Sequence, residues 1–176
     1  SYKGKNLSGE NPADQVSNGL IQVMEGRHCF EHLTVEENLL TGSYTRTQGR
    51  AAVAADLEMV YDYFPRLRER RKSQAGYTSG GEQQMVAIGR ALMSNPDLVL
   101  FDELSLGLAP IVIKDIYAQL PKITGQGMSA ILVEQDVTRA LSAANQFLCL
   151  VEGRVSLAGA PQDHSRDAIS AAYFGT

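Results

Sequence analysis

The 176-residue sequence lacks long hydrophobic runs, an excess of positive charge and more than two cysteines. No apolar segment approaches the ~20 residues of a membrane-spanning helix, and the first residues do not form a signal-peptide pattern. The sequence has 16 lysines and arginines but 20 acidic residues, so it lacks the excess of positive charge that is typical of nucleic-acid-binding proteins. Two cysteines make no disulfide framework and fit a reducing cytosol. We therefore expect one globular unit that reaches a membrane only through a partner.

The most informative stretch, residues 78–103, begins with a glycine-containing helix start. Apolar residues recur at helical spacing over residues 85–93, just after Ser79-Gly80-Gly81-Glu82. Glycines before a first turn let the backbone approach a ligand, and the free amides favour an anion such as phosphate. Ser79 and Glu82 also match the S-x-x-E capping box, in which the side chains satisfy the helix's own amides. Taken alone, the four residues favour the cap over the ligand.

The second half of this stretch predicts a buried strand that ends in two carboxylates. Asn95-Pro96 ends the helix, and residues 98–101 form an apolar run typical of a parallel strand covered on both faces. Asp102 and Glu103 follow, at the strand end where open α/β sheets bind ligands. Since neighbouring strand residues point to opposite sides, we expect one acid near a metal and the other near a reacting water.

The remaining segments predict further strands and helices. Thr34 with Glu37 repeats the capping-box pattern, Pro65 ends one helix, and Pro110 begins another. The cationic segment 66–72 is expected to be a solvated surface. We expect buried strands at 20–23 and 130–133, a loop or short helix over 11–18, helices over 35–40, 51–64, 110–123 and 136–144, a hairpin over 147–158, and a last helix ending near residue 173.

The sequence resembles the ATP-binding subunits of ABC transporters, most closely those for branched-chain amino-acid uptake. The resemblance rests on the order of its motifs: S-G-G-E-Q-Q, then a helix, then L-V-L-F-D-E, followed by L-S-L-G-L-A-P. The resemblance extends over essentially the whole chain. It implies one α/β, P-loop NTPase-like ATP-binding domain over residues 1–176. Within it, an incomplete parallel sheet would carry a helical subdomain at about residues 33–94 that docks on the transporter's membrane subunits. A second ATP-binding subunit and a cytoplasmic location, peripheral to the inner membrane, are also implied; nucleic acid is not.

The resemblance also implies roles for the conspicuous residues, with ATP and Mg²⁺ as cofactors. Asp102 would hold Mg²⁺ through a water, and Glu103 would polarise the water that attacks the γ-phosphate. This division suits phosphoryl transfer, which depends on positioning and charge neutralisation. The signature that serves the nucleotide of the opposite subunit would consist of Ser79, Gly80, Gly81 and Glu82.

Two further candidate residues depart from the general family pattern. Glu25, in the loop after the strand at 20–23, stands where the family usually has a glutamine. A carboxylate can bind Mg²⁺ or water but cannot donate as an amide does, and an exposed acid without a function is an equal alternative. Gln135 stands where most of the family has a switch histidine; its amide can bond the γ-phosphate but takes up no proton near neutral pH. Branched-chain subunits also have glutamine there, so Gln135 joins Glu103 as a candidate catalytic residue.

The sequence contains no G-x-x-x-x-G-K-[ST] phosphate loop (Walker A). The resemblance begins just downstream of that loop, so we expect a subunit without its first segment that by itself binds Mg·ATP very weakly and does not hydrolyse it. Thr78, Leu104 and the loop 106–109, which lacks the usual aspartate, also depart from the pattern and weaken the case for catalysis.

The absent segment would carry the strand beside the acidic one. Val99 and Leu100 are then expected to border an open edge or a hole, which pairing or strand exchange with a second copy would cover. Two functions stay open. The acid pair favours a fragment of an ATP-hydrolysing importer subunit, and the missing phosphate loop favours a non-enzymatic interaction module or an independently expressed cassette derived from such a subunit.

Overall fold

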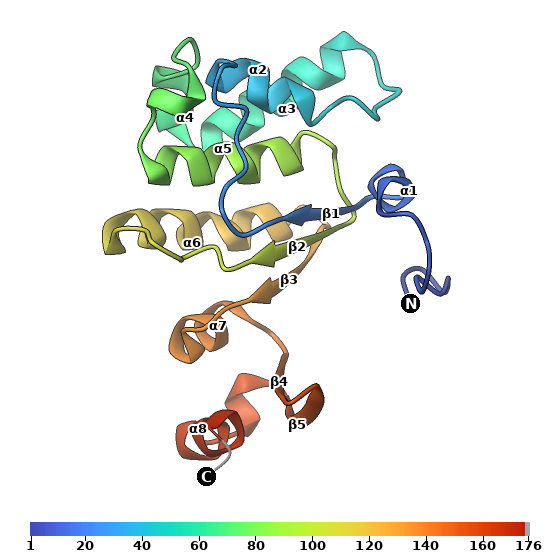
Figure 1. The fold of residues 1–176 in the computed structure, drawn as a ribbon, viewed down its shortest axis with the longest axis vertical. Coiled ribbons are helices and arrows are strands. Elements are labelled where there is room, and N and C mark those ends of the chain that lie inside the picture. Colours follow the sequence, from blue (N-terminus) through green and yellow to red (C-terminus); the bar gives the residue numbers. More distant parts are fainter. Residues whose placement is uncertain (175–176) are drawn as a thin grey trace. The chain divides into compact units, whose positions relative to one another are not determined.

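The computed structural model describes residues 1–174, which form two compact units, residues 1–131 and the residues from 132 onward. The elements are labelled in Figure 1. Unit 1 contains α1 (Pro12–Ser17), β1 (Leu20–Val23), α2 (Val35–Thr41), α3 (Arg50–Tyr63), α4 (Pro65–Glu69), η1 (Ala75–Tyr77), α5 (Gly80–Leu92), β2 (Leu98–Asp102) and α6 (Pro110–Thr124). β3 (Ser129–Val133) crosses into unit 2, which contains α7 (Val137–Ala143), β4 (Phe147–Val151), β5 (Arg154–Gly159), η2 (Pro161–Asp163) and α8 (Arg166–Phe174).

A three-stranded sheet with the order β1-β2-β3 lies at the centre of unit 1. β1 runs parallel to β2, with Ile21 opposite Val99 and Val23 opposite Phe101. These four side chains are buried and share one face of the pair. On the other face Gln22 is exposed and Leu100 only partly buried, so the pair is not covered on both faces as expected. The strands expected at 20–23, 98–101 and 130–133 are confirmed.

Two further expectations about this sheet are wrong. β2 lies between β1 and β3, so Val99 and Leu100 do not border an open edge. The reason is that the Ser129 amide bonds the Asp97 carbonyl at 2.9 Å, which brings β3 directly alongside β2. β3 itself is not buried: Ile131 is 52% and Val133 55% exposed, because β3 is the outer strand of this order. The argument for strand exchange at β2 therefore loses its basis.

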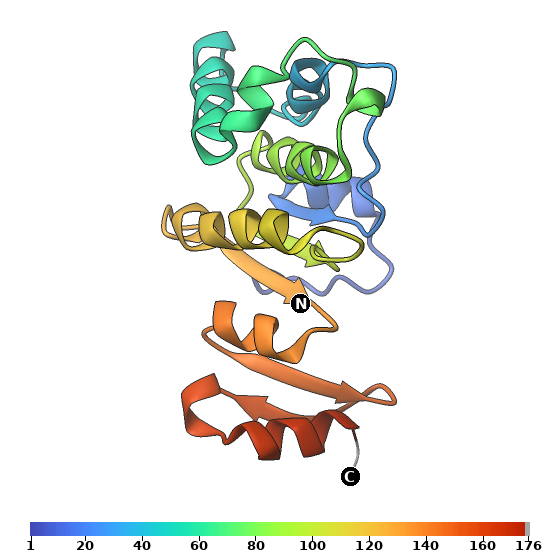
Figure 2. The ribbon, with the colours of Figure 1, turned by 90° about the vertical axis from the view of Figure 1, so that its left-hand side faces the viewer.

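Helices α2 to α5 form a helical layer in unit 1 (Figures 1 and 2). α5 is its centre, because it packs on α2, α3 and α4 as well as on β1 and α6. Gly89 permits the close approach: a Cβ at this position would lie 2.6 Å from Leu39 and 2.8 Å from Val60. The apolar faces of the predicted helices thus pack into the hydrophobic core of unit 1.

One helix of this layer was not expected from the sequence. Pro65 ends α3, as predicted, but it is also the first residue of α4. Proline suits that position because its fixed φ is helical and its missing amide needs no partner. The cationic segment 66–72 is therefore partly helical, and Leu67 within it is fully buried.

Unit 2 contains the expected hairpin and last helix. β4 pairs antiparallel with β5, with Leu150 opposite Val155 and a bulge between Cys149 and Leu150. α8 packs on this hairpin, and Cys149 and Ile169 are buried. No helix among the described residues is long and apolar enough to cross a membrane.

Candidate functional site

The predicted signature residues form the N terminus of α5. Ser79 is the N-cap: its Oγ accepts a hydrogen bond from the Glu82 amide at 3.3 Å, and Glu82 Oε2 accepts one from the Ser79 amide at 2.8 Å. The buried Glu82 also lies 3.7 Å from Arg70 Nε. The capping box is confirmed, so Ser79 and Glu82 stabilise the helix start whatever else they do.

The two signature glycines have different neighbours. A Cβ on Gly81 would lie 2.6 Å from Cγ1 of Val112, so Gly81 lets α5 pack closely on α6. A Cβ on Gly80 would lie 2.7 Å from Nη1 of Arg27. The backbone is indeed approached closely at both positions, and at Gly80 the approaching group is a guanidinium.

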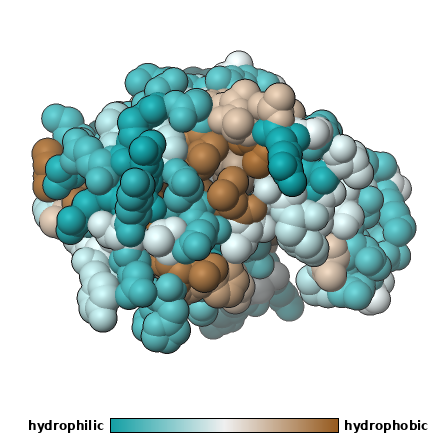
Figure 3. Space-filling view, turned by 90° about the horizontal axis from the view of Figure 1, so that it is seen from above, coloured by the Kyte–Doolittle hydropathy of each residue, from teal (hydrophilic) through white to brown (hydrophobic). Residues whose placement is uncertain are grey.

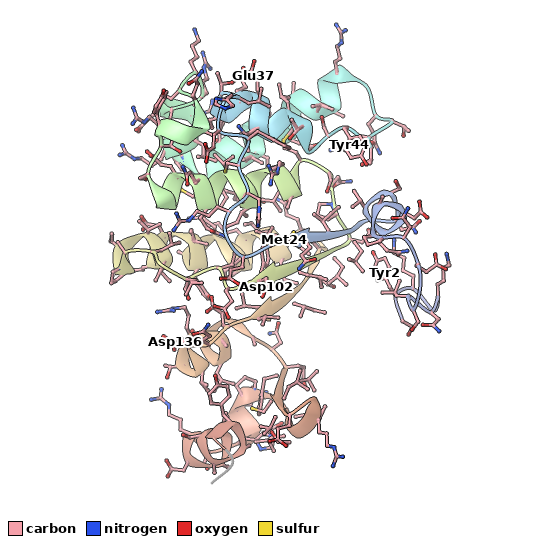
Figure 4. All side chains as sticks on the ribbon, viewed as in Figure 1. Tyr2, Met24, Glu37, Tyr44, Asp102 and Asp136 are labelled. Carbon is pink, nitrogen blue, oxygen red and sulfur yellow. The ribbon has the colours of Figure 1, made fainter. Side chains whose placement is uncertain are left out.

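The acid pair lies where β2 ends. Asp102 is the last residue of the strand, and Glu103 leaves it with a φ of 49°. This left-handed backbone ends the alternation of strand side chains on which the sequence prediction relied. Both residues are partly exposed, and Figure 4 labels Asp102 at the end of β2.

Two departures from the family pattern have structural explanations. Leu104 is 1% exposed and is part of the core directly after the acid pair. Thr78 is buried, and its Oγ1 donates to the Ala75 carbonyl at 2.7 Å, which closes the turn before α5. Both residues therefore support the loops that carry the candidate site.

Asp102 fits the ligand preference of Mg²⁺. This ion takes hard oxygen ligands, keeps several waters and is usually held by one or two carboxylates together with substrate phosphates. Among residues 1–174, no group of three or more His, Cys, Asp or Glu side chains is gathered for a metal. Asp102 at a strand end is thus suited to water-mediated binding beside a phosphate rather than to a complete protein cage.

The loop with Glu25 leaves the same end of the sheet as the acid pair. Val23 is paired with Phe101, so Met24, directly after β1, and Asp102, the last residue of β2, lie at the same end of two neighbouring parallel strands, as Figure 4 shows. Glu25 itself is exposed. Arg27, two residues further on, donates from Nη2 to the Gly107 carbonyl at 3.4 Å. The structure thus brings together the Glu25 loop, the signature helix start and the loop after the acid pair.

Asn38 is a supporting residue that the sequence analysis missed. It is completely buried in α2, and its Oδ1 accepts from the Phe30 amide at 2.8 Å. Its Nδ2 donates to the carbonyls of Phe30 at 3.0 Å and Thr34 at 2.9 Å. A polar residue on the buried side of a predicted helix was the available signal, because such a side chain needs partners.

Phe30, which Asn38 holds by its backbone, keeps an exposed ring. Its side chain is 52% exposed, and Arg90 of α5 places its guanidinium carbon 5.1 Å from the ring centroid. Partial burial lowers the pKa of Arg90 from its ordinary value. The aromatic ring and the cation together connect residues 30–34 to the signature helix.

Gln135 lies in unit 2, two residues after the end of β3. The next residue, Asp136, is the N-cap of α7, and its side chain accepts a hydrogen bond from the Arg139 amide at 3.0 Å. Gln135 is exposed. Its relation to Glu103, a residue of unit 1, stays a prediction.

The fold defined by these elements is that of ABC ATP-binding cassettes, which are P-loop NTPase-like α/β proteins. A solved cassette in its ADP conformation matches with a TM-score of 0.78 at 21% identity, over 98% of this chain and 74% of that chain. A nucleotide-free cassette matches with a TM-score of 0.76, also at 21% identity, over 94% of this chain and 69% of that one. The predicted fold class is confirmed.

Sequence comparison leads to the same class, because the model of the ABC transporter family matches residues 1–105. The chain belongs to the ABC transporter family. The high-affinity branched-chain amino acid transport ATP-binding protein BraG of Pseudomonas aeruginosa is 44% identical over 154 residues, which are 88% of this chain and 65% of BraG. The probable branched-chain amino acid transport ATP-binding protein LivF of Archaeoglobus fulgidus is 34% identical, over 84% of this chain and 62% of LivF. The chain thus spans somewhat less than two thirds of these relatives, and the predicted resemblance to branched-chain subunits is confirmed.

Proposed function

We propose that the chain serves as an ATP-binding subunit of an ABC importer for branched-chain amino acids. The observation that carries this proposal is the placement of the acid pair and the Glu25 loop at one end of the sheet, in contact through Arg27 with the start of α5. We further propose that residues 1–176 belong to one ATP-binding domain with a helical subdomain at about residues 33–94. Its partners are membrane subunits and a second ATP-binding subunit, at the cytoplasmic side of the inner membrane.

In this proposal each acid has a separate task. Asp102 holds Mg²⁺ through a water, and Glu103 orients the water that attacks the γ-phosphate. The bound ion supplies charge neutralisation at the phosphates. The left-handed backbone at Glu103 suits this division, since it turns the second carboxylate out of the strand geometry of the first. Gln135 accompanies Glu103 as a hydrogen-bond donor to the γ-phosphate or the water.

The signature serves the nucleotide of the opposite subunit. Ser79 and Glu82 already complete the hydrogen bonds of the helix start, which makes the first turn rigid. Gly80 and Gly81 bring no side chain of their own to the first turn of α5, and a helix start of this kind suits a phosphate brought by a second copy. Glu25 adds a carboxylate that binds water or Mg²⁺ at the end of β1.

We also propose that the 176-residue polypeptide by itself binds Mg·ATP very weakly and does not hydrolyse it. These residues include no G-x-x-x-x-G-K-[ST] loop to hold the β- and γ-phosphates. Positioning of these phosphates is the largest part of catalysis in this class, so the acid pair alone is insufficient.

A second candidate function is a non-enzymatic interaction module. Figure 3 views the helical layer of unit 1 from above and shows apolar side chains gathered between hydrophilic ones. Leu40 and Tyr44 of this layer are 39% and 75% exposed. Such a surface suits a protein partner and needs no nucleotide.

Calorimetric titration with Mg·ATP tests the proposal, using the unsubstituted chain, Glu103→Gln and Asp102→Ala. We expect no heat of binding at micromolar ATP and no phosphate release above a sample without protein. Micromolar binding that Asp102→Ala abolishes, or hydrolysis that Glu103→Gln abolishes, would contradict the predicted inactivity of this polypeptide and support a complete site.

A further inference from the structure

One side chain, Arg27 of the Glu25 loop, contacts two segments that are far from it in the sequence, the start of α5 and the loop that contains Gly107. Arg27 belongs to the Glu25 loop, and its Nη2 donates to the Gly107 carbonyl at 3.4 Å. The same guanidinium lies in front of α5, where a Cβ on Gly80 would be 2.7 Å from Nη1 and 2.9 Å from Cζ. A Cβ on Gly107 would also lie 3.7 Å from Nη2. Arg27 is therefore the point at which these loops meet.

Gly80 leaves the space that Arg27 occupies. Real Cβ atoms do not approach other atoms to 2.7 Å, so any larger residue at position 80 must displace the guanidinium. Because the guanidinium is the end of a flexible side chain, this displacement is cheap for the fold. At Gly81 the neighbour is instead Val112, whose methyl group is packed between two helices. The adjacent glycines thus serve two different contacts.

The backbone around Arg27 needs such a contact. Gly26, Arg27 and His28 have successive φ values of 88°, 68° and 46°, and the His28 amide bonds the Gly26 carbonyl at 2.7 Å. Left-handed backbone is unfavourable for Arg27 and His28, because their Cβ atoms approach the following carbonyl oxygen. Conformations of this kind persist where surrounding contacts hold them. The bond from Arg27 to Gly107 is one such contact.

We propose that Arg27 is a positioning residue, which holds the Glu25 loop against the first turn of α5 and against the loop 103–109. This inference rests on the proposed function, since it assigns Arg27 a role in that nucleotide site. It also gives Gly80 a task beyond admitting phosphate, namely admitting the arginine. Loss of the Arg27 side chain removes the contacts of the Glu25 loop with Gly80 and with Gly107.

Nuclear magnetic resonance of the isotope-labelled 176-residue chain tests the contact. Arg27→Ala and Gly80→Ala are expected to shift the same signals, the Gly107 carbonyl and the amides of residues 24–29. Hydrogen exchange of the amides in that loop should rise about fivefold, the factor that corresponds to one lost hydrogen bond. Arg27→Lys keeps a donor for Gly107 and should recover part of the shift.

Gly81→Ala is the matched control, because it meets Val112 and not Arg27. It should perturb α6 and leave the Gly107 carbonyl unshifted. The unfolding midpoint of Gly80→Ala should stay near that of the unsubstituted chain, which separates positioning from folding. The combined variant Arg27→Ala with Gly80→Ala should exceed neither single variant, since both remove one contact. An unchanged Gly107 signal in Arg27→Ala, or additive effects in the combined variant, would overturn the proposal.

Addition of Mg·ATP to the same samples separates this inference from the proposed function. A shift of residues 79–82 that is weaker in Arg27→Ala supports a positioning role in nucleotide binding. An equal shift in both samples removes that role. The absence of a shift in every sample speaks against nucleotide binding by this polypeptide, and the Gly107 comparison still decides whether Arg27 positions the loop.

Discussion

Single side chains connect the loops of the candidate site to the helical layer. Asn38 binds the backbone of residues 30–34, and Arg27 contacts both Gly80 and Gly107. Neither residue belongs to the signature or to the acid pair. At this scale the candidate site is a set of loops whose positions depend on a few polar contacts, since loop backbone has no regular hydrogen-bond ladder.

Asn38→Ala should lower the free energy of unfolding by roughly 2–3 kcal/mol, because it leaves buried backbone groups near Phe30 and Thr34 without partners. Urea unfolding measures this change. Ser43→Ala, which removes only a solvent-exposed hydrogen bond to the Leu40 carbonyl after the same helix, is the control and should cost well below 1 kcal/mol. Equal effects of the two substitutions would contradict the supporting role of Asn38.

Tyr61 makes the stability of unit 1 sensitive to high pH. Its ring is buried and its hydroxyl donates to Glu36 at 3.0 Å; burial and then this bond raise its pKa well above the usual range. Because the folded pKa exceeds the unfolded one, the stabilisation is complete below the unfolded pKa of about 10. It is lost as the pH rises further.

Urea unfolding between neutral and strongly alkaline pH checks this dependence. We expect the unfolding midpoint of the unsubstituted chain to fall above about pH 10, and to fall less in Tyr61→Phe. Tyr77→Phe, at a position 82% exposed, should behave like the unsubstituted chain. A steep alkaline loss that persists in Tyr61→Phe would assign the effect to another group.

At the scale of elements, α5 connects the two layers of unit 1. Its N terminus carries the signature, one side packs on α2, α3 and α4, and another contacts β1 and α6. A substitution at the start of α5 therefore affects the packing of both the sheet and the helical layer. The strands contribute by direction: β1 and β2 are parallel, so the loops that leave them begin side by side.

Ser79→Ala should reduce the free energy of unfolding by about 1 kcal/mol, the usual cost of a lost N-cap oxygen. Ser79→Thr keeps an oxygen at the same place and should stay within a few tenths of a kcal/mol of the unsubstituted chain. Thermal and urea unfolding measure both variants. If Ser79→Ala costs nothing, the capping box does not stabilise α5, and its hydrogen-bonding groups serve another purpose.

At the scale of the whole molecule, the chain consists of two compact units and spans 65% and 62% of the two relatives described above. One surface feature bears on association between copies. β3 is the outer strand of its sheet and exposes Ile131 and Val133.

Exposed apolar edge strands promote pairing between copies. We expect the chain to associate as its concentration rises in light scattering, and Ile131→Lys to weaken this association because a charge opposes edge pairing. Tyr44→Lys places the same charge on the helical layer and should leave association through β3 unchanged. A monomer at all concentrations would contradict the predicted oligomer.

Local signals in the sequence were sufficient for most of the elements, though not for α4, and for placing the acid pair at the end of β2 and the signature at the start of α5. The capping boxes at Thr34 and Ser79 join residues three apart, and the apolar runs of β1 and β2 follow from burial, so neither depends on distant partners. The motifs that resemble the ABC transporter family are likewise short segments of neighbouring residues, so they can be recognised without knowing the fold.

Only the tertiary structure decided which distant segments meet. Three contacts depend on the folding of the chain and not on the periodicity of one helix or strand. They are the placement of β3 beside β2, the guanidinium of Arg27 in front of Gly80, and the bonds of Asn38 to residues 30–34. A periodic pattern states which face of an element is buried but not which neighbour covers it. For that reason the acid pair was visible in the sequence, and the arginine that links its loop to the signature was not.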